Sequence, residues 1–199
     1  LTLKSWREAL HVFGWTVETE VLQACSGMDG GDLLEMILPT QSNLDRQAVR
    51  ELQGKLFEER YLHDIRPFPH VRTTVEQLRD NNRTIALATD CKGDTLAHYR
   101  KILQIDDLLH AISCGDDVAE GKPNPALLIH ALHKLDACAA DSVLIGDTPY
   151  DALAAAAVGV SSVGTLTGGF AAEDLRRAGC LETVPSLAHV PAALKAIGA

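Results

Sequence analysis

The chain has 199 residues, 46% of them hydrophobic, and a formal net charge of −9, which suits one core with or without a small accessory domain. The acidic balance, without any block of Lys and Arg, argues against nucleic acid as the main partner because phosphate backbones require clustered cations. No apolar run approaches the ~18 residues needed to cross a membrane, and the five scattered cysteines indicate reduced thiols and a cytoplasmic location.

Residues 1–62 are predicted to form helices only. Apolar residues recur at helical spacing in Leu3–Phe13, Val17–Cys25, Asp32–Leu38 and Leu44–Leu56. The following connector, Arg66–Pro69, is expected to be stiff and extended, because each proline fixes its own φ and restricts the residue before it. We therefore predict a helical domain over residues 1–62 and a second domain over residues 63–199.

Residues 63–199 are predicted to alternate helices with short apolar strands. This alternation indicates βαβ units and an α/β fold with a mainly parallel sheet. Strands are expected at Thr84–Ala88, Ala111–Ser113, Val143–Ile145 and Ser162–Leu166, with a short apolar piece near Leu181. Helices are expected at Val71–Arg79, Thr95–Leu103, Ala126–Leu135, Ala152–Val158 and Ala171–Ala178, with a last one through Leu194.

Thr89 and Asp90 follow the first expected strand. A hydroxyl group at this strand end, together with the backbone N–H groups that open the next helix, can hold a phosphoryl oxygen. The alternative is that both residues only cap that helix.

Lys122 lies in the segment Gly121–Pro125. Pro123 suits the first turn of the next helix and keeps Lys122 extended, so that the lysine side chain leaves the backbone in a defined direction. One ammonium group there can neutralise a transferring phosphoryl group. The alternative is a solvated lysine in a surface turn.

Asp147 and Asp151 belong to the sequence Gly146-Asp147-Thr148-Pro149-Tyr150-Asp151, which directly follows the strand expected at Val143–Ile145. A carboxylate at the carboxyl end of a buried strand suits Mg²⁺, which takes oxygen ligands. Thr148 is predicted to be the N-cap of the next helix, and Asp151 falls at the third helical position, where an acid pairs with the cap. For Asp151, function and capping both stay open.

Taken in order, Thr89-Asp90, Lys122-Pro123 and the sequence from Gly146 to Asp151 resemble the haloacid dehalogenase superfamily, close to its phosphoglycolate-phosphatase-like and β-phosphoglucomutase-like branch. The similarity extends over nearly the whole chain. It implies a Rossmann-like parallel core, a helical cap formed by residues 1–62, and a Mg²⁺-dependent phosphatase that acts on a small phosphorylated metabolite.

The resemblance also implies roles for single residues. Thr89 and Lys122 would be catalytic and would bind the phosphoryl group, the first through its hydroxyl group and the second by balancing charge, with Asp90 beside them. Asp147 would ligate Mg²⁺, and Asp151 would be catalytic and support the metal site. Asp90 departs from the branch, which often has Asn or Ser there, and an acid beside a phosphate helps only if its side chain turns away.

The family's first motif, Asp-x-Asp-Gly-Thr, does not occur in residues 1–199. In the family, its first Asp lies on the central strand and becomes the aspartyl-phosphate, so we expect that strand and nucleophile upstream of Leu1. A sugar phosphomutase and a non-catalytic binding protein on the same fold stay open as alternatives. A dehalogenase, which needs no metal, and a receiver domain fit less well.

Within residues 1–62, the glycine-rich loop Ser26–Gly31 is expected either to contact the unreacting part of the substrate through Met28 and Asp29 or to be only a turn between helices.

Overall fold

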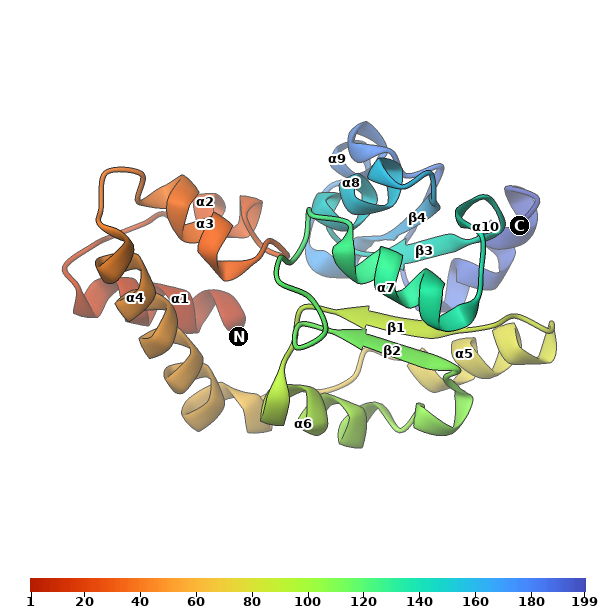
Figure 1. The fold of residues 1–199 in the computed structure, drawn as a ribbon, viewed down its shortest axis with the longest axis horizontal. Helices are drawn as coiled ribbons and strands as arrows, with labels where there is room; N and C mark the ends of the chain where they lie inside the picture. Colours follow the sequence, from red (N-terminus) through yellow and green to blue (C-terminus); the bar gives the residue numbers. More distant parts are fainter. The chain divides into compact units, whose positions relative to one another are not determined.

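The computed structural model describes residues 1–199, which divide into two compact units, Leu1–Arg66 (unit 1) and Pro67–Ala199 (unit 2). Figure 1 shows helices alone in unit 1 and strands with helices in unit 2. No helix combines the length and the apolar character needed to span a membrane.

Unit 1 is all-helical, as predicted. A hydrophobic core forms where its helices meet, and Leu10, Leu22, Leu34 and Val49 are almost fully buried in it. Its helices are α1 (Thr2–Val12), α2 (Thr19–Ala24), α3 (Gly30–Ile37) and α4 (Asn43–Leu56), followed by one π-helical turn (Phe57–Tyr61) and one 3₁₀ turn (Leu62–Asp64).

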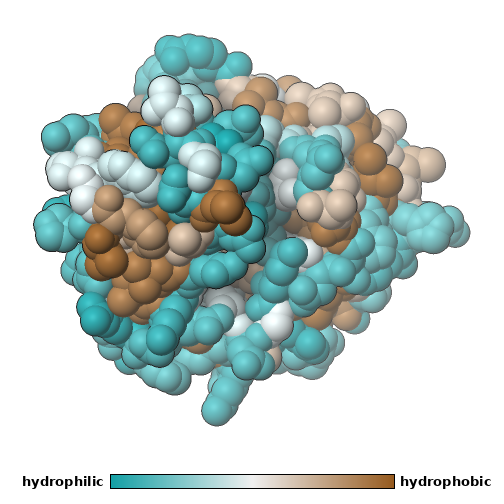
Figure 2. All heavy atoms as spheres, turned by 60° about the vertical axis from the view of Figure 1, so that its left-hand side comes forward, coloured by the Kyte–Doolittle hydropathy of each residue, from teal (hydrophilic) through white to brown (hydrophobic).

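The surface of unit 1 also carries apolar side chains. Figure 2 shows brown apolar patches among hydrophilic atoms. The large apolar side chains that unit 1 leaves exposed include Val12, Val21, Met36 and Leu44. Scattered exposed apolar residues are normal for a globular protein, so they do not by themselves mark a site.

Unit 2 has the predicted α/β architecture, and all its strand pairs are parallel. The helices between consecutive strands pack on the sheets, for example α7 on β1 and β2, and α8 on β3 and β4. The strands are β1 (Ala86–Thr89), β2 (Ala111–Cys114), β3 (Val143–Gly146), β4 (Ser161–Thr165) and β5 (Glu182–Val184). The helices are α5 (Val71–Asp80), α6 (Gly93–Leu103), α7 (Ala126–Leu135), α8 (Pro149–Ala157), α9 (Ala172–Ala178) and α10 (Val190–Ala196).

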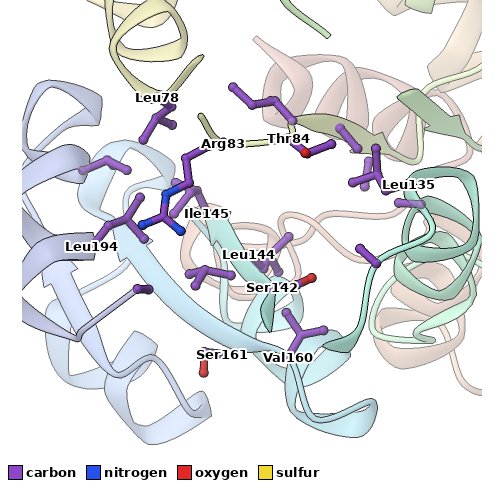
Figure 3. Close-up of a pocket in the computed structure, with 18 of the residues that line it drawn as sticks. Leu78, Arg83, Thr84, Leu135, Ser142, Leu144, Ile145, Val160, Ser161 and Leu194 are labelled. Atoms are coloured by element: carbon purple, nitrogen blue, oxygen red, sulfur yellow. The ribbon is translucent and has the colours of Figure 1, made fainter. Parts of the chain in front are cut away.

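The strands form two sheets rather than one. The first has the order β1-β2 and the second the order β3-β4-β5, so β1 and β3 each keep one edge without a strand partner. Both edges line one cavity of about 980 Å³, through Ala86–Ala88 and Val143–Ile145. In Figure 3, Leu78, Ile145 and Leu194 lie around this space together with the side chain of Arg83. The cavity is therefore a mainly apolar gap beside two open strand edges.

Helix α7 begins at Ala126, as the sequence predicted, but Pro123 does not lie in its first turn. Pro123 lies in the turn before the helix, and the Lys122–Pro123 peptide bond is cis. Pro125 is the N-cap, and the side chain of Asn124 accepts a hydrogen bond from the backbone N–H of Ala126 at 2.9 Å. Pro123 therefore precedes the first residue of the helix by three positions.

Candidate active site

The candidate residues lie in unit 2, next to the carboxyl ends of its strands. Thr89 is the last residue of β1, Asp147 directly follows β3, and Lys122 lies in the loop between β2 and α7. In parallel α/β sheets, this edge is where ligands bind. Three segments that are far apart in the sequence thus bring their polar side chains to the edge that the sequence predicted.

Lys122 is held between two carboxylates. Its Nζ atom lies 2.8 Å from Oδ1 of Asp151 and 3.4 Å from Oδ2 of Asp90. Burial alone would lower the pKa of Lys122, but the charges of Asp151 and Asp90 outweigh it and hold this pKa above the ordinary lysine range. Only 16% of the side chain is exposed, so Lys122 is not a solvated surface lysine.

Asp151 joins Lys122 to the start of α8. Its Oδ2 atom accepts hydrogen bonds from the backbone N–H of Asp147 at 3.2 Å and of Thr148 at 3.1 Å, and from the Thr148 hydroxyl at 2.8 Å. Thr148 and Asp151 form the predicted capping box, with Pro149 in the first turn. Burial would raise the pKa of Asp151, but Lys122 and Thr148 outweigh it and lower the pKa. Asp151 therefore caps the helix and faces Lys122.

Gly146 makes this close packing possible. A Cβ atom at position 146 would lie 2.4 Å from Cβ of Asp151, a distance that real Cβ atoms do not tolerate. Glycine is therefore required at position 146 for a steric reason, because it lets the first turn of α8 pack against the end of β3.

Asp147 has a different environment from Asp151. The hydroxyl of Thr167 donates to Oδ2 of Asp147 at 3.0 Å, and Thr165 and Thr167 share a hydrogen bond of 2.8 Å. Burial, together with the nearby charge of Asp151, raises the pKa of Asp147 against the opposing effects of Thr167 and Lys122. The ionised form of this carboxyl group is therefore disfavoured unless a cation binds beside it.

Thr167 is a site residue that the sequence interpretation missed. It follows β4 by two residues. The signal that identified Thr89, a hydroxyl residue at the end of an apolar strand, could also have identified Thr167.

Thr89 and Asp90 do not cap α6. The N-cap position belongs to Lys92, and the backbone N–H of Gly93 donates to Asp116 at 3.0 Å. The hydroxyl oxygen of Thr89 accepts a hydrogen bond from the backbone N–H of Cys91 at 3.2 Å. Burial raises the pKa of the Cys91 thiol, and a side-chain hydrogen bond with Thr89 opposes this. Asp90 turns its carboxylate to Lys122, the residue expected to balance the phosphoryl charge, so its side chain does not turn away from the candidate site.

Met28 and Asp29 lie in unit 1, where both have structural contacts. Asp29 caps α3 by accepting from the backbone N–H of Gly31 at 2.7 Å, and it pairs with Arg50 at 3.0 Å. Met28 packs against the helical core. These contacts account for both residues within the unit, so a contact with substrate stays a prediction.

Comparison with known proteins identifies one matching family and relatives that are named as phosphatases. A family model described as haloacid dehalogenase-like hydrolase matches residues 1–165. A phosphoglycolate phosphatase of Neisseria meningitidis is 31% identical over 156 residues, which cover 75% of this chain and 66% of that protein. The pyrophosphatase PpaX of Halalkalibacterium halodurans is 27% identical over 138 residues, which cover 66% of this chain and 64% of that protein. The chain thus spans slightly less than two thirds of the length of these curated relatives.

Among solved structures, a hydrolase from Pseudomonas syringae superimposes with a TM-score of 0.90 at 29% identity, covering 98% of this chain and 91% of that one. This similarity extends through both units.

Proposed function

Because the chain belongs to the haloacid dehalogenase-like hydrolase family, we propose that it acts as a Mg²⁺-dependent phosphatase on a small phosphorylated metabolite, through an aspartyl-phosphate. The observation that carries this proposal is the pairing of Lys122 with Asp90 and Asp151 at the strand ends beside Asp147. A fixed ammonium group can balance the charge of a transferring phosphoryl group, and a nearby carboxylate can hold a hard cation.

Asp147 is the proposed Mg²⁺ ligand. Its raised pKa, caused first by burial, supports this role because a bound cation would offset the cost of the buried charge. Residues 1–199 contain no group of three or more His, Cys, Asp or Glu side chains that could hold a metal ion, but Mg²⁺ commonly uses one or two carboxylates and keeps several waters. When bound, Mg²⁺ would stabilise negative charge on the phosphoryl oxygens.

Asp151 is proposed to support this site by holding its neighbouring residues in position. Its two oxygens already face Lys122 and the backbone N–H groups of Asp147 and Thr148. In this arrangement it orients both the lysine and the loop that carries Asp147. Thr89 is proposed to donate its hydroxyl hydrogen to a phosphoryl oxygen, and Lys122 to balance the charge that develops during transfer.

The nucleophile is proposed to lie outside residues 1–199, since these residues contain no Asp-x-Asp-Gly-Thr sequence. The open edges of β1 and β3 support this idea, because both line the same cavity. A further parallel strand between them would end beside Thr89 and Asp147. Unit 1, which has a core of its own, is proposed as the cap.

The substrate is proposed to be small. The relatives named phosphoglycolate phosphatase and pyrophosphatase support a phosphate ester or anhydride and no single compound. The five cysteines are unpaired, which supports the proposal of a cytoplasmic location.

Hydrolysis assays on the complete protein test the proposal. We expect turnover of a generic phosphate monoester with Mg²⁺ and none in excess chelator. Asp147→Asn should lose most activity, and Lys122→Ala should lower kcat by ~10²-fold or more. Lys134→Ala is the control, because Lys134 pairs with Asp117 and with the carbonyl of Ile112 rather than with a candidate site residue. Full activity in chelator, or normal turnover of Lys122→Ala, would overturn the proposal. A panel that includes phosphoglycolate and pyrophosphate would then rank substrates.

A further inference from the structure

Asp90 touches Lys122 at two places. Its Oδ1 atom accepts a hydrogen bond from the backbone N–H of Lys122 at 3.1 Å, and its Oδ2 atom lies 3.4 Å from the Nζ atom of the same residue. One carboxylate therefore fixes both the backbone and the ammonium group of the lysine. A residue that only neutralised a buried charge would need the second contact alone.

The backbone of Asp90 is itself held in place. The N–H of Gly115, directly after β2, donates to the carbonyl of Cys91 at 3.1 Å. A Cβ atom at position 115 would lie 2.3 Å from the carbonyl oxygen of Asp90. The loop after β1 therefore packs tightly against the end of β2, so the Asp90 side chain starts from a fixed anchor.

Charge at the site gives Asp90 a second effect. Asp90 and Asp151 share one ammonium group, that of Lys122. Every carboxylate that shares this ammonium group weakens its attraction for an incoming phosphate dianion. Asp151 has a second task in capping α8, but Asp90 does not cap a helix.

We propose that Asp90 is a positioning residue that orients Lys122 and partly neutralises its charge, so that the site binds phosphate more weakly than it would without this carboxylate. The inference rests on the proposed function for the role of Lys122. It makes the carboxylate at position 90 a determinant of phosphate affinity.

Two substitutions of Asp90 distinguish the positioning of Lys122 from the neutralisation of its charge. Asp90→Asn keeps an oxygen that can accept from the Lys122 backbone and removes the charge. Asp90→Ala removes both. The matched control is Asp116→Asn, because Asp116 is a carboxylate at the same edge that accepts from the backbone N–H of Gly93 and has no contact with Lys122.

The first experiment measures binding of inorganic phosphate in metal-free buffer by calorimetry. Asp90→Asn should bind phosphate about fivefold more tightly than the unchanged protein, the scale expected for one partly exposed ion pair. Asp116→Asn should not. Equal affinity for Asp90→Asn and the unchanged protein would overturn the inference.

The second experiment tests positioning without any assay of activity. A double-mutant cycle of Asp90→Ala with Lys122→Met, read by denaturant unfolding, should show non-additive changes, because the two residues share contacts. In the complete protein, Asp90→Asn should also retain more of kcat than Asp90→Ala. Additive unfolding changes would overturn the inference even if Lys122→Met abolishes hydrolysis. Coupled changes without any effect of Lys122→Met on hydrolysis would support the positioning role and overturn the proposed function instead.

Discussion

At the scale of single residues, Asp147 and Asp151 show how two acids four positions apart acquire opposite properties. Asp151 faces an ammonium group and several donors, and its pKa is lowered although burial opposes this. Burial has the largest effect on the pKa of Asp147 and raises it. Asp151 therefore stabilises the fold in its ionised form, whereas ionised Asp147 has an electrostatic cost that a bound ligand could relieve.

The raised pKa of Asp147 predicts a pH-dependent gain in stability for Asp147→Asn. A carboxyl group with a raised folded pKa stabilises the protein while it is protonated, and this contribution is lost as pH rises through that pKa. Asn does not ionise. In metal-free buffer, Asp147→Asn should therefore gain thermal stability over the unchanged protein as pH rises from about 4 to about 7.

The measurement is thermal unfolding at several pH values, with Asp80→Asn as the control because Asp80 is an exposed residue at the end of α5. Addition of Mg²⁺ at neutral pH should stabilise the unchanged protein and not Asp147→Asn. A stability difference between the two that does not change with pH would contradict the prediction.

Some candidate site residues can be recognised from the sequence directly around them, and others cannot. Thr89, Lys122 and Asp147 could be found because each lies beside an apolar strand or a proline, where short patterns predict position. The contact between Asp90 and Lys122 spans 32 positions, and that between Thr167 and Asp147 spans 20. Such partners depend on which loops meet at the sheet edge, and no local pattern contains that information.

At the scale of elements, the N-terminus of α8 is the best-determined feature. Thr148, Pro149 and Asp151 fill the cap, first and third helical positions, as the sequence predicted. Strand positions were also predicted to within about two residues, an ordinary margin for element ends. The start of α7 at Ala126 was predicted too, but the place of Pro123 was not, because this proline lies in the turn before the helix and not in its first turn.

The capping box predicts a local cost for Thr148→Ala. This substitution removes the hydroxyl that accepts from the backbone N–H of Asp151, so the free energy of unfolding should fall by about 1 kcal/mol. Ser42→Ala, which removes the cap of α4, is the matched control for stability. Both should lower stability in denaturant titrations, but only Thr148→Ala should also weaken phosphate binding, since Thr148 holds Asp151 opposite Lys122. Equal phosphate affinity in the two variants would contradict this.

At the scale of the whole molecule, the sequence predicted a parallel α/β core, and the structure confirms it. The order of the strands could not be derived from periodicity, because an apolar run does not say which neighbour it pairs with. The strands are divided into two sheets beside one cavity, and the expected further strand between them stays a prediction.

The open edges of β1 and β3 have a consequence for handling residues 1–199 in isolation. Unpaired strand edges are templates for intermolecular pairing, so concentrated solutions should aggregate by strand addition. Light scattering should rise with concentration, and Leu87→Lys, which places a charge on the β1 edge, should suppress it. Leu153→Lys removes an exposed apolar side chain from α8 without touching an edge. If both substitutions suppress scattering equally, surface hydrophobicity rather than strand addition is the cause of aggregation.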